Sequence, residues 1–215
     1  MKTLTRETRD ALTPAMALDV LRKGNERFVN NLKSNRNLLQ QVNETSAGQH
    51  PLAIVLSCID SRTSAELIFD QGLGDIFSCR IAGNIMNEDI LGSMEFACRV
   101  AGAKAIVVLG HTKCGAVKGA CEGVELGNLT TLLQKILPSV QSEVTEHPYL
   151  STNDQAFVER VATRHVLRVR AQILENSPIL ASMIENSDIV LLGGMYDVES
   201  GAVQFYDAHI SMGSK

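Results

Sequence analysis

Short apolar runs that alternate with helical patterns constrain the fold of this chain more than any other feature. Runs without polar alternation are typical of strands buried on both faces of a parallel sheet. Segments with helical spacing lie between them, and this alternation predicts an α/β fold with a mainly parallel central sheet flanked by helices. The predicted strands are 52–56, 75–79, 105–109 and 188–192, and the predicted helices are 64–71, 90–100, 116–120, 130–146 and 157–175.

The N-terminal region has a different pattern. After a Thr-Pro start, apolar residues including Leu18 and Leu21 recur at helical spacing over residues 13–32, which predicts an amphipathic helix. This helix either packs on its own domain or docks on a second subunit. The polar segment 40–50 is predicted to be a connecting loop.

The chain is expected to form one compact domain. Residues 1–48 are assigned to an N-terminal helical arm and linker, and residues 49–215 to the α/β domain that would carry any catalytic site. Near the end, the stretch M-Y-D-V-E-S-G-A-V-Q-F-Y-D at 195–207 places a Glu-Ser-Gly turn between two short runs. It predicts a C-terminal hairpin or edge strand.

Charge and hydropathy exclude two classes of partner. The chain has 20 basic and 24 acidic residues and no long basic run, so binding to a nucleic acid backbone has no electrostatic basis. The first ten residues mix charges of both signs, and every apolar run is far shorter than the roughly 20 residues that span a bilayer. We therefore expect a cytoplasmic protein with no nucleic acid or membrane partner.

The five cysteines lack the dense spacing of a disulfide framework. In a reducing compartment, thiols beside other reactive side chains more often bind metal or catalyse than form disulfides. The sequence predicts small core residues at Cys79, Cys98 and Cys121, which lie among apolar or small neighbours. It predicts surface or capping positions for His50, His147, His165 and His209.

Two reactive stretches follow predicted strands. C-I-D-S-R occupies 58–62 after the first strand, and H-T-K-C-G occupies 111–115 after the third. Ligands of open parallel sheets gather at the carboxyl ends of strands, so neighbouring strands would bring two thiolates and one imidazole together. Such a set suits zinc and leaves a fourth position for water, substrate or Asp60. The alternatives are two buried thiols with a satisfied histidine, or a structural zinc site with Asp60 as fourth ligand.

These stretches belong to a longer series of motifs that resembles the β-class carbonic anhydrases. The resemblance implies zinc-dependent, reversible hydration of carbon dioxide to bicarbonate and a proton. It implies zinc ligands at Cys58, His111 and Cys114, and a catalytic pair of Asp60 and Arg62. The matching motifs are C-I-D-S-R at 58–62, Q-G-L-G-D-I-F at 71–77, R-I-A-G-N at 80–84, G-S-M-E-F-A at 92–97 and V-V-L-G-H-T-K-C-G-A at 107–116.

The same resemblance implies a substrate pocket and an assembly. It implies a homodimer or homotetramer in which the adjoining subunit supplies part of that pocket. Phe96 replaces the tyrosine of plant relatives, which leaves an apolar wall suited to a small nonpolar gas. The implied substrate-binding residues are Gln49, Phe77, Ala82 and Phe96. Gly115 is assigned to the same pocket because it and the helix expected after Cys114 can direct backbone N–H groups at the thiolates and favour nearby anions.

The chemistry of the Cys-x-Asp-x-Arg spacing is sensible beside the resemblance. Two thiolates cancel the formal charge of zinc, so the metal alone acidifies water less and other groups must compensate. Asp60 can accept a hydrogen bond from the reacting water, while a bidentate Arg62 keeps Asp60 ionised. Asp60 could instead ligate and block the zinc, but we favour the open arrangement.

Two other functions remain open from the sequence. The same scaffold can host hydrolysis of carbon disulfide or carbonyl sulfide, although nothing between Gln49 and Gly115 favours it. A zinc-carrying or redox-sensing module would use the same thiolates without turnover.

Overall fold

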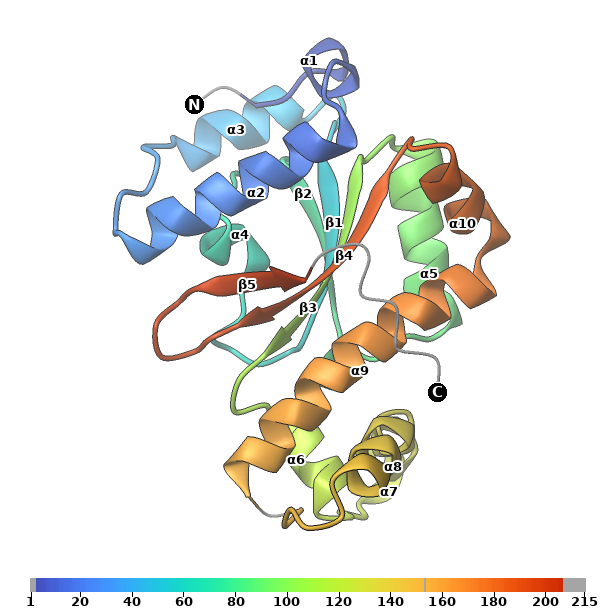
Figure 1. The fold of residues 1–215 in the computed structure, drawn as a ribbon. Coiled ribbons are helices and arrows are strands. Elements are labelled where there is room, and N and C mark those ends of the chain that lie inside the picture. Colours follow the sequence, from blue (N-terminus) through green and yellow to red (C-terminus); the bar gives the residue numbers. More distant parts are fainter. Residues whose placement is uncertain (1–2, 153, 207–215) are drawn as a thin grey trace.

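The computed structural model describes residues 3–152 and 154–206 and has one five-stranded sheet at its centre (Figure 1). The strand order is β2-β1-β3-β4-β5. Strands β1 to β4 pair in parallel, and β5 pairs antiparallel with β4. The α/β fold with a mainly parallel sheet and a C-terminal hairpin is thus confirmed. The strands are β1 (Ala53–Ser57), β2 (Ile76–Arg80), β3 (Ala105–His111), β4 (Val190–Tyr196) and β5 (Val203–Tyr206).

The predicted burial of the strands is right for the centre of the sheet and wrong for its edge. Every residue of β1 and β3 is buried, whereas β2 alternates between buried and more exposed positions. The reason is that β2 has a neighbour on one side only. In β4, the strand extends to Tyr196 because it pairs along the whole length of β3.

Alternate side chains of the central strands support two separate cores. Ile54 and Leu56 of β1 lie in a large cluster that includes side chains of α5, α9 and α10. Ala53 and Val55 face the opposite cluster, with side chains of α2 and α4. Helices therefore cover both faces of the sheet, and α6, α7 and α8 lie beyond the carboxyl end of β3 (Figure 1). These helices are α2 (Pro14–Val29), α4 (Ala65–Ile68), α5 (Glu88–Glu95), α6 (Gly115–Cys121), α7 (Gly127–Gln134), α8 (Leu137–Glu146), α9 (Gln155–Asn176) and α10 (Pro178–Glu185).

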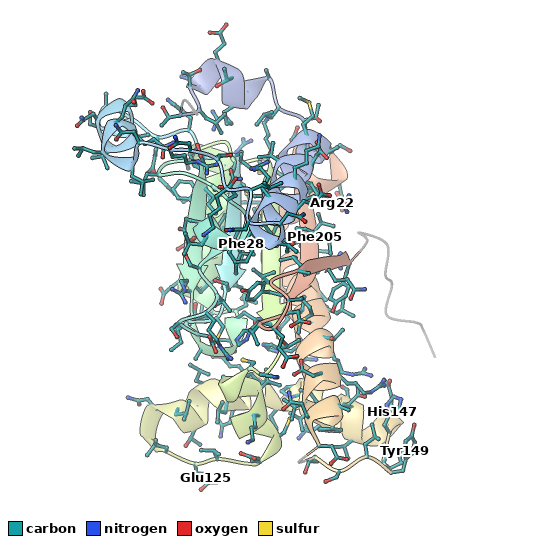
Figure 2. All side chains as sticks on the ribbon, turned by 90° about the vertical axis from the view of Figure 1, so that its left-hand side faces the viewer. Arg22, Phe28, Glu125, His147, Tyr149 and Phe205 are labelled. Carbon is teal, nitrogen blue, oxygen red and sulfur yellow. The ribbon has the colours of Figure 1, made fainter. Side chains whose placement is uncertain are left out.

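The N-terminal helix α2 packs on its own chain. Its Leu21 is fully buried in the core beneath β1 and β3. Gly24 allows a close approach, because a Cβ there would collide with the Phe69 carbonyl oxygen. The Arg22 guanidinium lies 5.5 Å from the centre of the Phe205 ring of β5 (Figure 2). These contacts place α2 across the sheet face that α4 also covers.

One predicted loop and one predicted helix are wrong. The loop predicted over 40–50 is helical in its first half, where α3 (Leu38–Thr45) begins with Asn37 accepting a hydrogen bond from the Gln40 N–H. Burial of Gln41, which accepts from the Leu73 N–H, stabilises this polar helix through tertiary contact. The single helix predicted over 130–146 is divided into α7 and α8, because a new helix begins at Leu137 with Pro138 in its first turn.

Further helical structure lies outside the predicted segments. The helices α1 (Arg6–Asp10) and α10 have no counterpart in the sequence prediction. The predicted helix 90–100 ends as a wider π turn over Phe96–Val100. Within the described ranges, no helix combines the length and apolar character needed to cross a membrane.

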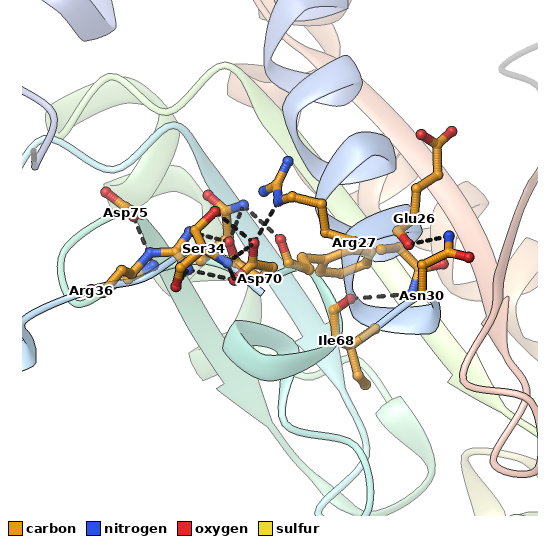
Figure 3. A network of polar contacts seen from close by, with 12 residues as sticks. Glu26, Arg27, Asn30, Ser34, Arg36, Ile68, Asp70 and Asp75 are labelled. Atoms are coloured by element: carbon orange, nitrogen blue, oxygen red, sulfur yellow. Dashed lines mark hydrogen bonds and ion pairs between the residues drawn. The ribbon is translucent and has the colours of Figure 1, made fainter. Parts of the chain in front are cut away.

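A buried ionic network joins the N-terminal arm, residues 1–48, to the end of α4 (Figure 3). The Asp70 side chain is only 3% exposed and accepts hydrogen bonds from Arg27, Arg36 and Ser34. Burial alone would raise the pKa of Asp70, but these hydrogen bonds outweigh it and lower the pKa to about 2. The ionised carboxylate therefore connects α2 and the segment after it to the end of α4.

We predict that Asp70→Asn lowers the free energy of unfolding by about 2–3 kcal/mol at pH 7, because a folded pKa near 2 lies below the unfolded value of about 3.9. This contribution is present above the unfolded pKa and is lost as pH falls through the folded pKa. The difference between the two proteins should therefore shrink between about pH 4 and pH 2. Urea unfolding at pH 7 and pH 3 measures it.

Asp19→Asn provides the matched control. Asp19 pairs with Lys23 at an exposed site, where a salt bridge is worth about 0–1 kcal/mol. Equal losses from the two substitutions, or a difference at Asp70 that grows at acid pH, would contradict the role of this network.

Candidate metal centre

The pairing of β1 with β3 brings Cys58, His111 and Cys114 together. Cys58 directly follows β1, and His111 is the last residue of β3. The register pairs Ser57 of β1 with Leu109 of β3, so both strands end at the same edge of the sheet. The two sulfurs and a ring nitrogen lie within 4.8 Å of one another, and all three residues are buried.

A tight turn joins the second and third members of this group. The Thr112 N–H donates to the Tyr196 carbonyl oxygen at 2.9 Å, and the Thr112 hydroxyl oxygen accepts from the Val198 N–H at 3.0 Å. Lys113 then adopts a left-handed conformation with φ +55°. This turn reverses the chain, so that Cys114 at the start of α6 faces His111.

His111 has the tautomer that a metal ligand needs. Its Nδ1 lies 2.9 Å from the Thr112 carbonyl oxygen, which can only accept, so Nδ1 carries the proton. Nε2 therefore holds the lone pair, and it is buried without a hydrogen-bond partner among the described residues. A buried imidazole nitrogen without a partner, beside two sulfurs, fits a metal ion at this position.

The electrostatics of the two sulfurs favour a cation between them. Hydrogen bonding from Cys114 lowers the pKa of Cys58, and the same interaction raises the pKa of Cys114. The pair therefore resists carrying two negative charges unless a positive ion joins it. The Gly83 N–H donates to Cys58 Sγ at 3.3 Å and stabilises its thiolate. Zinc accepts this combination of soft sulfur and borderline nitrogen ligands.

Backbone groups of α6 support the second thiolate. The sequence predicts that the helix after Cys114 directs N–H groups at the sulfurs. In the structure, the backbone of Val117 and Ala116 interacts with Cys114 and opposes the rise of its pKa.

Asp60 and Arg62 form a bidentate pair next to this group. Arg62 Nε donates to Asp60 Oδ1 at 2.9 Å, and Arg62 Nη2 donates to Asp60 Oδ2 at 2.7 Å. These hydrogen bonds hold the pKa of Asp60 well below its usual range. Asp60 is not among the residues whose ligand atoms lie within 4.8 Å of one another. In the structure, Asp60 therefore pairs with Arg62 and is not part of the Cys58–His111–Cys114 group.

The structure separates the residues expected to bind substrate. Ala82 and Gly115 line a cavity of about 430 Å³ together with Cys58 and Asp60. Most of the remaining lining is apolar.

The aromatic candidates line a different cavity. Phe77 and Phe96 border a space of about 670 Å³, with ring centres 6.2 Å apart. Phe77 is paired with Ile54, four residues before Cys58, which corresponds to about 13 Å along a strand. Phe96 is 51% exposed and Gln49 is also exposed. None of these three residues is among those that line the cavity at Cys58 and Asp60.

Two supporting residues were not singled out from the sequence. Arg80, the last residue of β2, donates to the carbonyl oxygens of Cys58 and Asp60 at 3.1 and 2.6 Å. The Thr63 hydroxyl donates to the Cys58 carbonyl oxygen at 3.0 Å. The position of Arg80 at the same edge of the sheet is the sequence signal that could have identified it.

The cysteines outside this group largely follow the prediction. Cys98 and Cys121 are buried in the core and Cys79 packs partly against it, each as a free thiol. Burial raises the pKa of Cys98 to about 12 and that of Cys121 to about 11. They are small core residues with unreactive thiols.

One of the four histidine predictions is wrong. His165 is buried, because it lies on the face of α9 that packs into the core. Burial lowers its pKa to about 4, and its Nδ1 lies 3.3 Å from the Ser139 hydroxyl oxygen. His50 is half-buried, and His147 contacts Glu143 and Arg160 beside α8. His209 lies outside the described residues.

The sheet and the Cys–His–Cys group define an α/β protein with a metal-competent site at the carboxyl ends of parallel strands. Comparison with known proteins adds the family. The carbonic anhydrase family model matches residues 53–203. Carbonic anhydrase 2 of Mycobacterium tuberculosis strain H37Rv is 34% identical over 203 residues, covering 90% of this chain and 93% of that protein.

Solved structures agree with the sequence comparison. The β-carbonic anhydrase CafA of Aspergillus fumigatus gives a TM-score of 0.72 at 30% identity, covering 80% of this chain and 83% of that one. The β-carbonic anhydrase CcaA gives 0.73 at 26% identity, covering 88% and 95%. The chain belongs to the β-class carbonic anhydrases and is an enzyme of that family.

We predict that the purified protein binds one zinc ion per chain and that His111→Asn weakens binding more than about 100-fold. Losing an outer partner of a ligand already costs about 10- to 100-fold, so losing the ligand itself should cost more. Chelator competition measures the affinity. Cys79→Ser is the control, and a variant at His111 that keeps the zinc affinity of the wild type would exclude His111 as a ligand.

Proposed function

We propose that this enzyme is a zinc-dependent carbonic anhydrase that catalyses reversible hydration of carbon dioxide to bicarbonate and a proton. The observation that carries the proposal is the buried Cys58–His111–Cys114 group beside the Asp60–Arg62 pair. In this group, His111 Nε2 has no hydrogen-bond partner among residues 3–152 and 154–206. Family membership supports the reaction, and the donor set supports the metal.

Cys58, His111 and Cys114 would hold the zinc. They would supply two sulfurs and one nitrogen, and three protein ligands are typical of a catalytic and not of a structural zinc site. When bound, the zinc supplies the Lewis acidity that brings the pKa of a water molecule toward neutral. The Gly83 N–H and the α6 backbone withdraw charge from the sulfurs and so preserve that acidity.

Asp60 would orient the reacting water. Its carboxylate stays ionised because Arg62 donates to both of its oxygens, so it can accept a further hydrogen bond but gives up no proton near neutral pH. Arg62 also fixes the direction of the carboxylate. The pair would thus orient a water molecule toward carbon dioxide, and Asp60 itself would not serve as a metal ligand.

The substrate pocket would be completed by a second copy of the chain. Ala82 and Gly115 line the same cavity as Cys58 and Asp60, whereas Gln49, Phe77 and Phe96 are not among its lining residues. The edge strand β2 and the exposed Phe96 beside it provide a surface for a homodimer or a homotetramer. Reduced thiols at the metal site suit a reducing compartment such as the cytoplasm.

Stopped-flow measurement of carbon dioxide hydration tests the reaction, and Asp60→Asn tests the site. We expect zinc-loaded wild type to be active and chelator-stripped protein to be inactive. Asp60→Asn should keep its zinc but lose about 100-fold or more of the hydration rate at neutral pH. Cys79→Ser serves as the control for handling and folding.

Other results would overturn the proposal. Faster hydrolysis of carbon disulfide or carbonyl sulfide than hydration of carbon dioxide would assign a different substrate. Stoichiometric zinc without hydration at neutral or alkaline pH would indicate a binding module. An unchanged rate in Asp60→Asn would remove Asp60 from the mechanism.

Subunit complementation tests the shared pocket. We predict that Gln49→Ala and Cys58→Ser homomers are each weakly active, and that mixed assemblies recover activity. In a mixed assembly, one intact metal centre faces the intact Gln49 of the other chain. Hydration by the re-associated mixture should exceed the mean of the two separate samples. Activity equal to that mean would place the whole pocket within one chain.

A further inference from the structure

The turn between two of the metal-site residues contains a backbone conformation that costs free energy. Lys113 lies between His111 and Cys114 and has φ +55°, in the left-handed region where residues with a Cβ are uncommon. Glycine would adopt this conformation freely. Since the chain has lysine here, contacts from elsewhere must hold the turn in place.

Glu159 of α9 supplies such a contact. Its Oε1 accepts a hydrogen bond from the Lys113 backbone N–H at 2.7 Å, across 46 residues of sequence. Gln155, one turn earlier on α9, donates to the same carboxylate oxygen. The other oxygen, Oε2, is buried without a hydrogen-bond partner in the described part of the chain. The carboxylate is therefore held by α9 and directed at the turn.

The core fixes the position from which Glu159 acts. Phe157, Val158 and Val161 of α9 are buried in the larger of the two cores, so the start of this helix cannot shift without disturbing that core. Glu159 lies among them in sequence but contacts the turn. A charge-assisted hydrogen bond is stronger than a neutral one. From a helix that cannot shift, it can hold the backbone of the turn in one conformation.

We propose that Glu159 is a positioning residue of the metal centre. By holding the Lys113 N–H, it keeps the left-handed turn formed and so sets the relative placement of His111 and Cys114. The link to catalysis rests on the proposed function, whereas the effect on the turn does not. No part of the carbon dioxide chemistry is assigned to Glu159 itself.

A second carboxylate contacts the same lysine and provides a matched control. Glu199 pairs with the Lys113 ammonium group, but the two side chains are 46% and 70% exposed. It acts on the side chain, not on the backbone of the turn. Exposed pairs of this kind contribute little, so Glu199→Gln should leave the metal centre unchanged.

The first measurement is the rate of zinc release to a chromophoric chelator from the full-length holoprotein. Glu159→Ala should release zinc about 10- to 100-fold faster than wild type, the range typical of a lost supporting partner. Alanine favours helix, so α9 should remain folded. Glu159→Gln keeps an acceptor oxygen and should stay near the wild-type rate.

Lys113→Gly tests whether the effect runs through the left-handed turn. Because glycine needs no support at φ +55°, Glu159→Ala should accelerate release much less in the Lys113→Gly background than in wild type. An equal acceleration in both backgrounds, or a wild-type release rate in Glu159→Ala, would overturn the proposal. So would loss of zinc from Glu199→Gln as fast as from Glu159→Ala.

Amide hydrogen exchange gives a readout that does not depend on metal or activity. The Lys113 N–H should exchange slowly in metal-free wild type and in Glu159→Gln, and quickly in Glu159→Ala. Equal exchange in all three would overturn the inference even if the enzyme is active. A wild-type protein that holds no zinc but shows this exchange pattern would instead count against the proposed function alone.

Discussion

The parallel pairing of β1 with β3 is the interaction on which the rest of the molecule depends. Its register sets Ser57 beside Leu109, and everything reactive follows within a few residues of those positions. A shift of one residue would turn each strand's buried side chains toward the opposite core. The apolar side chains that fill both cores therefore fix the register, and the register fixes where Cys58 and His111 leave the sheet.

The hydrogen bonds at that edge of the sheet surround the buried Cys58–His111–Cys114 group, which lowers the stability of the fold when no metal is bound. The two buried sulfurs cannot both be ionised without repulsion, so one of them keeps its proton. His111 Nε2 has no hydrogen-bond partner among the described residues. Unpaired buried polar atoms are uncommon in folded proteins, since each costs free energy. The surrounding hydrogen bonds from Arg80, Thr63 and the Gly83 N–H hold the loops in place despite this cost. A divalent cation would remove both penalties together.

The sequence alone predicts the fold and the composition of the site, because both depend on local patterns. Apolar runs reveal the strands, and the carboxyl-end rule brings Cys58 to His111. What it misses depends on tertiary contacts: α3 is helical through the burial of Gln41, and His165 is buried by the packing of α9. Glu159 contacts a backbone group 46 residues away, and no motif spacing indicates such a contact. Arg80 could have been identified only from its position at the end of a strand. Edge position, as in β2, also follows from strand order and not from composition.

Helix α9 connects the core to the turn at residues 111–114, which explains how an exposed turn can keep a well-defined conformation. Turns are usually the least constrained part of a fold, since they pack on one side only. Here the turn receives its restraint from a carboxylate whose helix is fixed by Phe157 and Val161 in the core. Part of the restraint on the Lys113 turn therefore comes from apolar packing through this hydrogen bond, and the rest comes from the hydrogen bonds of Thr112 with Tyr196 and Val198. Substitutions deep in α9 should then disturb the Cys58–His111–Cys114 group when they move Glu159.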